Sequence, residues 1–436
     1  MSTALLQSMV KAQKQGKAAG IYSICSANRY VLEASMMQAK RDNSAVCIES
    51  TSNQVNQYGG YTGMTAAQFA AYMKDIAKQV GLGTDKIILG GDHLGPNAWQ
   101  KEPAKPAMEK ALELVRSCVL AGYTKIHLDA SMRCADDPGG KHTPLAEETV
   151  TARAAEMCAA AEEAYATLPK GSPAPVYIIG TEVPVPGGEQ ADHAGIAVTK
   201  TEDAERTIAV SREAFKKRRL DAAWERVIGV VVQPGVEFSD NHVFPYERAK
   251  AKALSQVIEK HEGLVYEAHS TDYQTAQGLK ELVEDHFAIL KVGPWLTFAF
   301  REAVFALAEI EREWLSDNDN VSLSRIRMIL DEVMMENPVY WKPYYVGDNA
   351  YVRYARKFSY SDRSRYYWPQ PKLDAALTKL VNNLTAHPAP LTVLSQFMPP
   401  QYELVRAGKI ANEPKALLHS KVMEVTGYYA KACGAK

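Results

Sequence analysis

The sequence predicts an α/β fold, a closed (β/α)8 TIM barrel that is followed by a C-terminal helical extension. Eight apolar, strand-like runs alternate with longer helical patterns over about 290 residues, which is typical of parallel strands closed into a barrel. An open, doubly wound sheet would need a glycine-rich dinucleotide loop after the first strand, and residues 23–30 contain no glycine. The alternation stops at about residue 317. We therefore expect a barrel with an N-terminal helix at residues 1–316, and a helical, Tyr/Trp-rich extension at residues 317–436 packed on it.

The predicted elements follow one another in a regular order. A polar segment at residues 1–20 predicts a short helix before the first strand. The eight predicted strands are the apolar runs at residues 20–25, 45–49, 86–90, 125–129, 175–180, 227–232, 264–268 and 287–292. The predicted helices lie near residues 31–39, 69–80, 106–121, 146–165, 199–219, 247–260 and 271–285, with a closing helix from Pro294. Thr65 and Gln68 form a capping box in front of the second of these helices.

Composition and charge exclude several classes of partner. The formal net charge is -1, the pI is about 6.8 and the mean hydropathy is -0.26, so no basic surface suits nucleic acid or an anionic membrane. No apolar run approaches the roughly 18 residues of a membrane span, and residues 1–20 lack the apolar core of a secretory signal. Six scattered cysteines without a CxxC motif indicate reduced thiols and a cytoplasmic protein.

The most informative stretch is GGDHLGPN at residues 90–97. It follows the apolar run 87–89, so a buried strand delivers an acid and an imidazole to its carboxyl end. Asp92 and His93 can there serve a metal site in two roles, because an imidazole binds a divalent ion and a carboxylate accepts a proton from a metal-bound hydroxyl. An adjacent Asp and His can also simply hydrogen-bond to each other at a strand end, without any function. The residues at the other strand ends decide between this interpretation and a metal site.

Polar side chains gather at the predicted carboxyl ends of the strands, where barrel enzymes place their chemistry. After the second to fifth strands these are Glu49, Asn53 and Gln54, then Asp92, His93 and Asn97, then Asp129 and Ser131, and then Glu182. After the sixth to eighth strands they are Gln233, then His269, Ser270, Thr271 and Asp272, and then Lys291 and Gly293. Their coincidence with strand ends favours a functional site.

Two imidazoles and a carboxylate in this set predict a metal centre. His93, Glu182 and His269 would leave coordination positions open for substrate, as catalytic Zn²⁺ requires, with Mn²⁺, Co²⁺ or Ni²⁺ as alternatives. Gln233 could approach as a weak neutral ligand or as a hydrogen-bond donor. The alternative for His269 is a buried histidine paired with Glu267, which lies two residues earlier on the same strand face.

The last two strands predict a phosphate site. Ser270 and Thr271 stand at an expected helix start, with Thr271 and Gln274 as a capping box, and backbone N–H groups there suit a phosphate. The N–H groups after Lys291 and Gly293 suit one equally well. Lys291 is either a counter-charge for that phosphate or a surface lysine near the rim.

The extension contains a Tyr/Trp/Arg-rich segment, with YWKPYY at residues 340–345 and SDRSRYYWP at residues 361–369. One interpretation is a helical extension that only packs on the barrel. The other is a lid whose Arg363 or Arg365 reaches an anionic substrate, in the same subunit or in a neighbouring one.

Two chemistries are disfavoured. A Schiff-base aldolase would need a lysine projecting into the barrel centre, but the sixth strand has none and Lys125 begins its strand rather than ending it. His127, on the same strand, is interpreted as a satisfied core histidine one layer below Asp129. No P-loop motif occurs, and we expect neither a nucleotide nor a nicotinamide cofactor.

With these residues assembled, the chain resembles the tagatose-bisphosphate aldolase GatZ/KbaZ-type family nearly end to end. The resemblance rests on the strings ESTSNQVNQ (49–57), GGYTG (59–63), GGDHLGPN (90–97), IHLDAS (126–131), GTEVPVPGG (180–188), VQPGVEF (232–238), YEAHSTDYQT (266–275) and YYWP (366–369). The family is similar to class II, metal-dependent aldolases built on a TIM barrel.

Carried over to this sequence, the class II pattern implies that His93 and His269 are zinc ligands and that Asp92 is the proton-transferring carboxylate. It also implies that Ser270 contacts a phosphate and that Asp129 assists the reaction.

One departure from the class II pattern concerns the third ligand. Class II aldolases place a further histidine after the sixth strand, where this chain has Gln233. That difference leaves Glu182 as the third ligand, and we count Glu182 with Asp92 and Asp129 among the candidate catalytic residues.

The resemblance leaves three functions open: an accessory subunit for a class II aldolase catalytic partner, a 4-epimerase on tagatose or its phosphate, and, in older labels, a tagatose-6-phosphate kinase. Our hypothesis is an enzyme on ketohexose phosphates that interconverts tagatose 6-phosphate and fructose 6-phosphate at C4, or that cleaves tagatose 1,6-bisphosphate. We expect a homo-oligomer.

Overall fold

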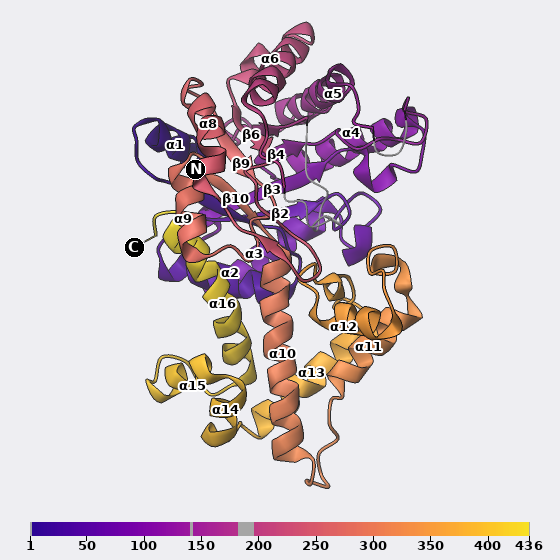
Figure 1. Cartoon of the computed structure of the whole chain (residues 1–436), viewed down its shortest axis with the longest axis vertical. Coiled ribbons are helices and arrows are strands. Elements are labelled where there is room, and N and C mark those ends of the chain that lie inside the picture. The colour runs from indigo at the N-terminus through magenta and orange to yellow at the C-terminus, as the bar shows by residue number, and fades with distance from the viewer. Residues whose placement is uncertain (1, 140–142, 182–195, 436) are drawn as a thin grey trace.

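The chain folds around a closed barrel of eight parallel strands in a computed structural model that describes residues 2–139, 143–181 and 196–435 (Figure 1). Around the barrel the strands follow the order β1-β10-β9-β6-β5-β4-β3-β2, with parallel pairing throughout. The predicted fold class is therefore confirmed. An antiparallel hairpin, β7 (Glu237–Phe238) with β8 (Val243–Phe244), lies outside the barrel between β6 and α8.

The barrel strands coincide with the predicted apolar runs. They are β1 (Ile21–Ile24), β2 (Val46–Thr51), β3 (Ile87–Leu94), β4 (Lys125–Leu128), β5 (Val176–Ile179), β6 (Val227–Val232), β9 (Val265–Ala268) and β10 (Ile289–Val292). The strand β3 runs on to Leu94, whereas the apolar pattern predicts an end at Gly90. This extension carries Asp92 and His93 within the strand rather than after it.

Helices surround the barrel between its strands. They are α2 (Arg29–Arg41), α3 (Ala66–Val80), α4 (Ala104–Leu120), α5 (Glu147–Ala166), α6 (Thr201–Lys217), α7 (Asp221–Trp224), α8 (Arg248–Glu259) and α9 (Ala276–Glu284). The predicted capping box of Thr65 and Gln68 is confirmed at the start of α3. No helix of the described residues is long and apolar enough to cross a membrane.

The helix α1 (Ser2–Lys14) closes the amino-terminal end of the barrel. Its Leu6, Met9 and Val10 pack in one buried cluster with barrel residues such as Ile88 and Val265. Apolar burial of this kind is the main stabilising term of a protein core. The chemistry is therefore confined to the opposite end, at the carboxyl ends of the strands.

The predicted capping box at Thr271 and Gln274 is wrong. The helix α9 begins at Ala276, and its cap is Thr275, whose hydroxyl accepts a hydrogen bond from the Gly278 backbone N–H at 3.0 Å. The Thr271 hydroxyl instead donates to a backbone carbonyl of β10 at 2.6 Å. Residues 270–275 therefore form a turn at the barrel mouth before the helix starts.

The helix α10 (Pro294–Leu315) begins at the barrel mouth and continues away from the barrel into the C-terminal helices (Figure 1). These are α11 (Ile326–Glu336), α12 (Asn349–Phe358), α13 (Pro371–Ala386), α14 (Leu391–Phe397), α15 (Pro399–Arg406) and α16 (Pro414–Ala432). The last of them returns to pack against α2, α9 and α10. Tyr429 of α16 donates a hydrogen bond to the backbone carbonyl of Thr271 at 2.7 Å, so the end of the chain is fastened beside the barrel mouth.

Candidate metal centre and active site

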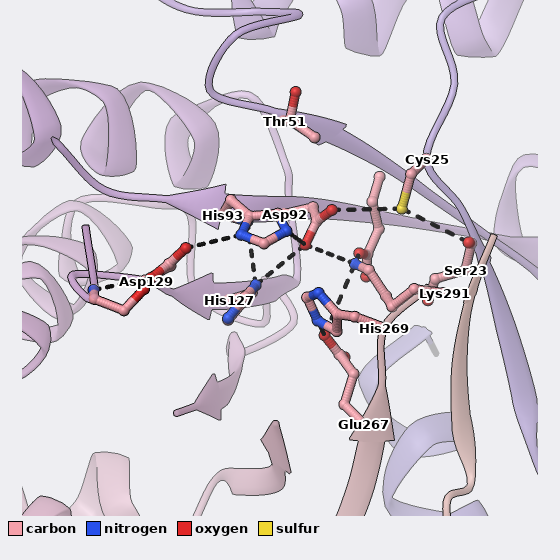
Figure 2. Close-up of polar contacts among 12 residues, drawn as sticks. Ser23, Cys25, Thr51, Asp92, His93, His127, Asp129, Glu267, His269 and Lys291 are labelled. Carbon is pink, nitrogen blue, oxygen red and sulfur yellow. Dashed lines mark hydrogen bonds and ion pairs between the residues drawn. The ribbon is translucent and has the colours of Figure 1, made fainter. Parts of the chain in front are cut away.

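An irregularity in β3 places Asp92 and His93 side by side. Successive strand side chains normally point to opposite faces, but the register of β3 against β4 shifts within residues 91–94, and His93 adopts a left-handed backbone conformation with φ of 47°. Both side chains therefore enter the barrel interior, where both are buried (Figure 2). A Cβ at Gly90 would lie 2.8 Å from the side chain of Glu49, so the glycine makes room for that carboxylate.

Below Asp92 lies a buried network that we call the charged floor, formed by Glu49, Lys125, Glu267 and Lys291. The Nζ of Lys125 is 2.5 Å from Glu49 Oε1 and 2.5 Å from Glu267 Oε2, and all three side chains are 0% exposed. The Nζ of Lys291 pairs with Glu49 and lies 2.9 Å from Asp92 Oδ1. The contact between β4 and β9 crosses the barrel interior, because these strands are not neighbours in the sheet.

The charged floor corrects three predictions. Although Lys125 is the first residue of its strand, its side chain projects into the barrel centre, and Lys291 is not a surface lysine. Glu49 is sealed beneath the pocket rather than available to substrate at its rim. Burial lowers the pKa of Lys125, but Glu267 and the other nearby acidic groups together outweigh burial and raise this pKa, so the lysine is a charged ammonium. A Schiff base at Lys125 is therefore disfavoured, for a reason other than its place in the strand.

Three histidines form an imidazole cluster above the charged floor. The distances between ring centres are 5.1 Å for His93 and His127, 4.9 Å for His93 and His269, and 5.2 Å for His127 and His269. Imidazoles that share one tetrahedral Zn²⁺ have ring centres roughly 5 Å apart, because each ligating nitrogen lies about 2.1 Å from the ion. The ring spacing thus resembles that of a metal site, but the donor atoms that lie within 4.8 Å of one another belong to His127 and His269, with Asp92 and Glu267, and not to the predicted ligand His93.

Each ring of the imidazole cluster also lies within hydrogen-bond distance of a buried carboxylate. The pairs are His93 Nδ1 with Asp129 Oδ2 at 2.7 Å, His269 Nε2 with Glu267 Oε1 at 2.9 Å, and His127 Nδ1 with Asp92 Oδ1 at 3.1 Å. Histidines that bind metals characteristically place one ring nitrogen on such a partner. The Nε2 of His127 is buried without a hydrogen-bond partner, so His127 is not the fully satisfied core histidine that its position predicted.

Burial and close charges set the protonation of these groups. Burial raises the pKa of Asp92, but His93 and the hydrogen bond with His127 outweigh burial and hold it well below its usual range. Burial lowers the pKa of His93, but Asp92 and Asp129 outweigh it and raise this pKa to about 9. For His269 burial dominates and lowers the pKa, which leaves a neutral ring suited to binding a metal ion.

The donor set fits a divalent cation. Donor atoms of Asp92, His127, Glu267 and His269 lie within 4.8 Å of one another. The surrounding buried groups comprise the four carboxylates Asp92, Asp129, Glu49 and Glu267, and the two ammonium groups Lys125 and Lys291. When all the imidazoles are neutral, which for His93 requires loss of the proton that Asp92 and Asp129 favour, this set has two excess negative charges, which one divalent ion would balance. Buried charges require such compensation, so the residues suit a metal ion.

The imidazole cluster faces a pocket at the barrel mouth. The predicted site residues that line it are Asn53, Gln54, Asp92, His93, His269, Ser270, Asp272, Lys291, Gly293 and Arg365. Arg365 reaches the pocket from the C-terminal helices through the short 3-10 turn Arg363–Tyr366. The extension therefore supplies part of the pocket wall within the same chain.

Other predicted residues have structural roles near the pocket. The Ser131 hydroxyl donates to Asp129 at 2.6 Å, and the Asn97 side-chain oxygen accepts from Gln100 at 3.2 Å. Thr271 is buried and bonded to backbone, as described above. Arg363 stacks on Tyr344 and donates to a backbone carbonyl at 3.1 Å.

One predicted metal ligand, Gln233, is not brought to the imidazole cluster. The Gln233 side-chain oxygen accepts the backbone N–H groups of Gly235 at 2.8 Å and Val236 at 3.0 Å, so it closes a turn instead of serving as a ligand. Glu182 lies outside the described residues.

The amino terminus of α10, where a phosphate was expected, already holds a side chain. Asp272 Oδ1 accepts the backbone N–H groups of Gly293 at 3.0 Å and Trp295 at 2.8 Å. These are the groups that would bind a phosphate at a helix start. Asp272 is therefore a cap for α10 and not a residue that attracts phosphate.

Sequence reasoning missed the parts that Lys125 and His127 play in the site, whereas it offered Glu267 as a partner of His269, and these two side chains do lie 2.9 Å apart. A usable signal existed, because residues 125, 127 and 129 alternate along one strand and so share the inward face. Glu267 and His269 share a face in the same way. Tyr366 and Cys25 also line the pocket, and no local pattern distinguishes them from other residues of their segments.

Comparisons with known proteins bear on the family and the fold. A family model described as D-tagatose-1,6-bisphosphate aldolase subunit GatZ/KbaZ-like matches residues 6–434. A crystal structure described as a probable tagatose 6 phosphate kinase from Sinorhizobium meliloti 1021 is 45% identical, with a TM-score of 0.86 over 95% of this chain and 100% of that chain.

A more distant likeness is to a fructose-bisphosphate aldolase (Fba) from Campylobacter jejuni. Its TM-score is 0.46 at 14% identity, over 88% of this chain and 93% of that chain, which is too remote to bear on function. The family match spans nearly the whole sequence and confirms the resemblance in the strand-end strings. The chain belongs to the GatZ/KbaZ-like family of D-tagatose-1,6-bisphosphate aldolase subunits.

Proposed function

We propose that this chain is a metal-dependent enzyme that interconverts D-tagatose 6-phosphate and D-fructose 6-phosphate by inverting C4. The observation that supports it best is the setting of Asp92. Its Oδ1 contacts Lys291 and His127, whereas its Oδ2 meets only the weak thiol donor of Cys25, at 3.5 Å, among the contacts of the described residues. This ionised carboxylate keeps one oxygen able to accept a proton, beside a set of metal-binding groups.

The imidazole cluster would hold the ion, with Asp92 and Glu267 beside it, and Zn²⁺ is the first choice for such donors. A divalent ion bound there would stabilise negative charge on the C2 oxygen of a ketose.

Asp92 performs the proton transfer. Its carboxylate accepts the proton of the C4 hydroxyl, the C3–C4 bond breaks, and its electron pair passes to C3 to give the enediolate of a three-carbon fragment. The other fragment is an aldehyde at C4. When this aldehyde turns and presents its opposite face, the C3–C4 bond forms again, Asp92 returns the proton, and C4 is inverted. Release of the aldehyde would instead give aldolase cleavage.

The test is incubation of the metal-loaded protein alone with tagatose 6-phosphate, followed by NMR of the sugar. We expect fructose 6-phosphate to form, and Asp92→Asn to abolish its formation while the protein remains folded. Metal content tests the ligand set: His93→Ala, His127→Ala and His269→Ala should each lose metal, and Gln233→Ala should retain it. Formation of dihydroxyacetone and glyceraldehyde 3-phosphate without an epimer would show that the protein is an aldolase.

The family description contains the word subunit, which supports a second candidate: a non-catalytic partner that stabilises a class II aldolase. In that case Asp92→Asn and His93→Ala would leave activation of the partner intact. The kinase label of the similar structure predicts ADP formation from ATP and tagatose 6-phosphate, which a coupled ADP assay would detect.

A further inference from the structure

The amino terminus of α10 borders the pocket, and the carboxylate of Asp272 occupies the backbone N–H groups at this helix terminus. Asp272 is 2% exposed, lines the pocket and accepts both the Gly293 and Trp295 N–H groups through one oxygen. A phosphate at the same place would have to displace this carboxylate or lie against it. Like charges in a buried setting repel strongly, because the surrounding dielectric is low.

The described residues that line the pocket offer limited positive charge for anions. Among the described residues that line it, the lysine and arginine side chains are those of Lys291 and Arg365. Lys291 is engaged by Glu49 and Asp92. Arg365 donates through one terminal nitrogen to the backbone carbonyls of Ser361 and, at 3.1 Å, Asp362, and through the other to the Tyr366 hydroxyl at 2.9 Å. A guanidinium has five N–H donors, so further donors remain for a ligand.

Arg365 belongs to a segment that we call the strap, residues 359–366. The strap is anchored at the hairpin by Asp240, whose carboxylate accepts the Ser359 hydroxyl at 3.1 Å and whose backbone carbonyl accepts the Tyr360 N–H at 2.8 Å. It is anchored at α10 by Arg301, whose Nε lies 3.6 Å from Asp362 Oδ1 in a buried pair. These contacts fix the position of the guanidinium before any ligand arrives, which is the arrangement of a built binding site.

We propose that the pocket takes a ketohexose with a single phosphate group, bound by Arg365, and that Asp272 excludes a second phosphate from the amino terminus of α10. The choice of sugar rests on the proposed function. The exclusion follows from the charges at this end of the pocket.

Calorimetric binding of D-tagatose 6-phosphate and D-tagatose 1,6-bisphosphate tests the proposal. The titrations use metal-loaded protein carrying Asp92→Asn, so that turnover adds no heat. We expect the monophosphate to bind at least about tenfold more tightly than the bisphosphate. Adding Asp272→Asn, which keeps an oxygen for both N–H groups and removes the charge, should reduce this preference about tenfold. Equal or tighter binding of the bisphosphate before that change would overturn the proposal, as would an unchanged preference after it.

Two arginine variants locate the phosphate. Arg365→Met should weaken binding of both sugars by at least about tenfold, whereas Arg353→Met, at an exposed position on α12, should change neither. If Asp272→Asn does not fold, Asp272→Ser takes its place, and the preference of the parent protein is decisive in either case. If neither sugar binds, the proposal is wrong.

The outcome is separate from that of the proposed reaction. A protein that prefers the monophosphate but forms no fructose 6-phosphate when Asp92 is intact would refute epimerisation and leave the binding proposal standing. A protein that epimerises the monophosphate yet binds the bisphosphate equally well would refute the binding proposal alone.

Discussion

Replacement of Lys125 by methionine tests whether the charged floor holds the barrel together. Methionine has a similar length and no charge, so the variant removes the ammonium without leaving a large cavity. Glu49 and Glu267 would then be buried carboxylates that have lost the cation lying 2.5 Å from each of them. The remaining lysine, Lys291, pairs with Glu49 but lies 3.8 Å from Glu267.

The expected loss is the difference between two large terms. At an effective dielectric constant of about 20, each 2.5 Å contact of Lys125 is worth roughly 7 kcal/mol of attraction. Desolvation of the ammonium offsets several kcal/mol of that attraction. Removal of one partner from a buried ion pair generally destabilises by about 3–5 kcal/mol, because an uncompensated charge stays behind. We expect a loss in this range for Lys125→Met.

Reversible urea unfolding, followed by tryptophan fluorescence in the presence of a chelator, measures the effect without a contribution from bound metal. Lys252→Met, at an exposed position on α8, is the control and should change the unfolding free energy by less than about 0.5 kcal/mol. The double variant Lys125→Met, Glu49→Gln should recover part of the loss, because one of the two unpaired carboxylates is neutral. A loss below about 1 kcal/mol for Lys125→Met would refute the electrostatic account of the floor.

Three further predictions concern other parts of the site. Burial raises the pKa of Asp272 to about 6 from 3.8, so the folded state binds this proton more tightly, and stability should fall by about 2 kcal/mol as the pH rises from 4 to 7. Thermal unfolding of Asp272→Asn should lack this pH-dependent component, and a stability that rises with pH would contradict the prediction. Gly95→Ala should destabilise by several kcal/mol in thermal unfolding, because its Cβ would collide with a backbone carbonyl after β4, whereas Gly263→Ala has open space and should be tolerated. Arg301→Lys should loosen the strap, because lysine cannot replace the guanidinium that pairs with Asp362. Calorimetry should then show about tenfold weaker binding of tagatose 6-phosphate. Loss of bound metal in this variant would instead indicate a wider structural role for Arg301.

The apolar runs predicted all eight barrel strands, because parallel strands buried on both faces are continuous hydrophobic segments. The same rule predicts that β3 ends at Gly90, because Gly91, Asp92 and His93 are not apolar, whereas the observed strand runs on to Leu94. The strand continues through them only because neighbouring strands pair with it on both sides. Tertiary pairing of that kind leaves no mark in the local sequence.

The depth of each side chain within the barrel was harder to predict. Period-two alternation puts Lys125, His127 and Asp129 on one face, but their height along the barrel axis depends on the stagger between strands. Because Lys125 is the first residue of its strand, the sequence predicts that its side chain does not reach the barrel centre. In the structure this side chain contacts Glu49 and Glu267 across the barrel interior. Similarly, Arg363 and Arg365 are two residues apart, and only the short 3-10 turn determines which of them faces the pocket.

The barrel interior has an apolar layer and a charged layer, and this arrangement constrains the proposed reaction. The apolar layer includes Ile88, Ile178, Val231 and Val265 and packs against α1, whereas the charged floor and its neighbours lie nearer the barrel mouth. A sugar whose C4 hydroxyl reaches Asp92 must therefore enter from the mouth and present that hydroxyl toward the charged layer. Inversion at C4 requires the aldehyde to turn through about half a rotation while Arg365 holds its phosphate. One anchored phosphate permits this turn about a single point, whereas phosphates fixed at both ends of the sugar would restrain both fragments. The filled amino terminus of α10 therefore agrees better with the proposed epimerisation of a monophosphate than with cleavage of a bisphosphate.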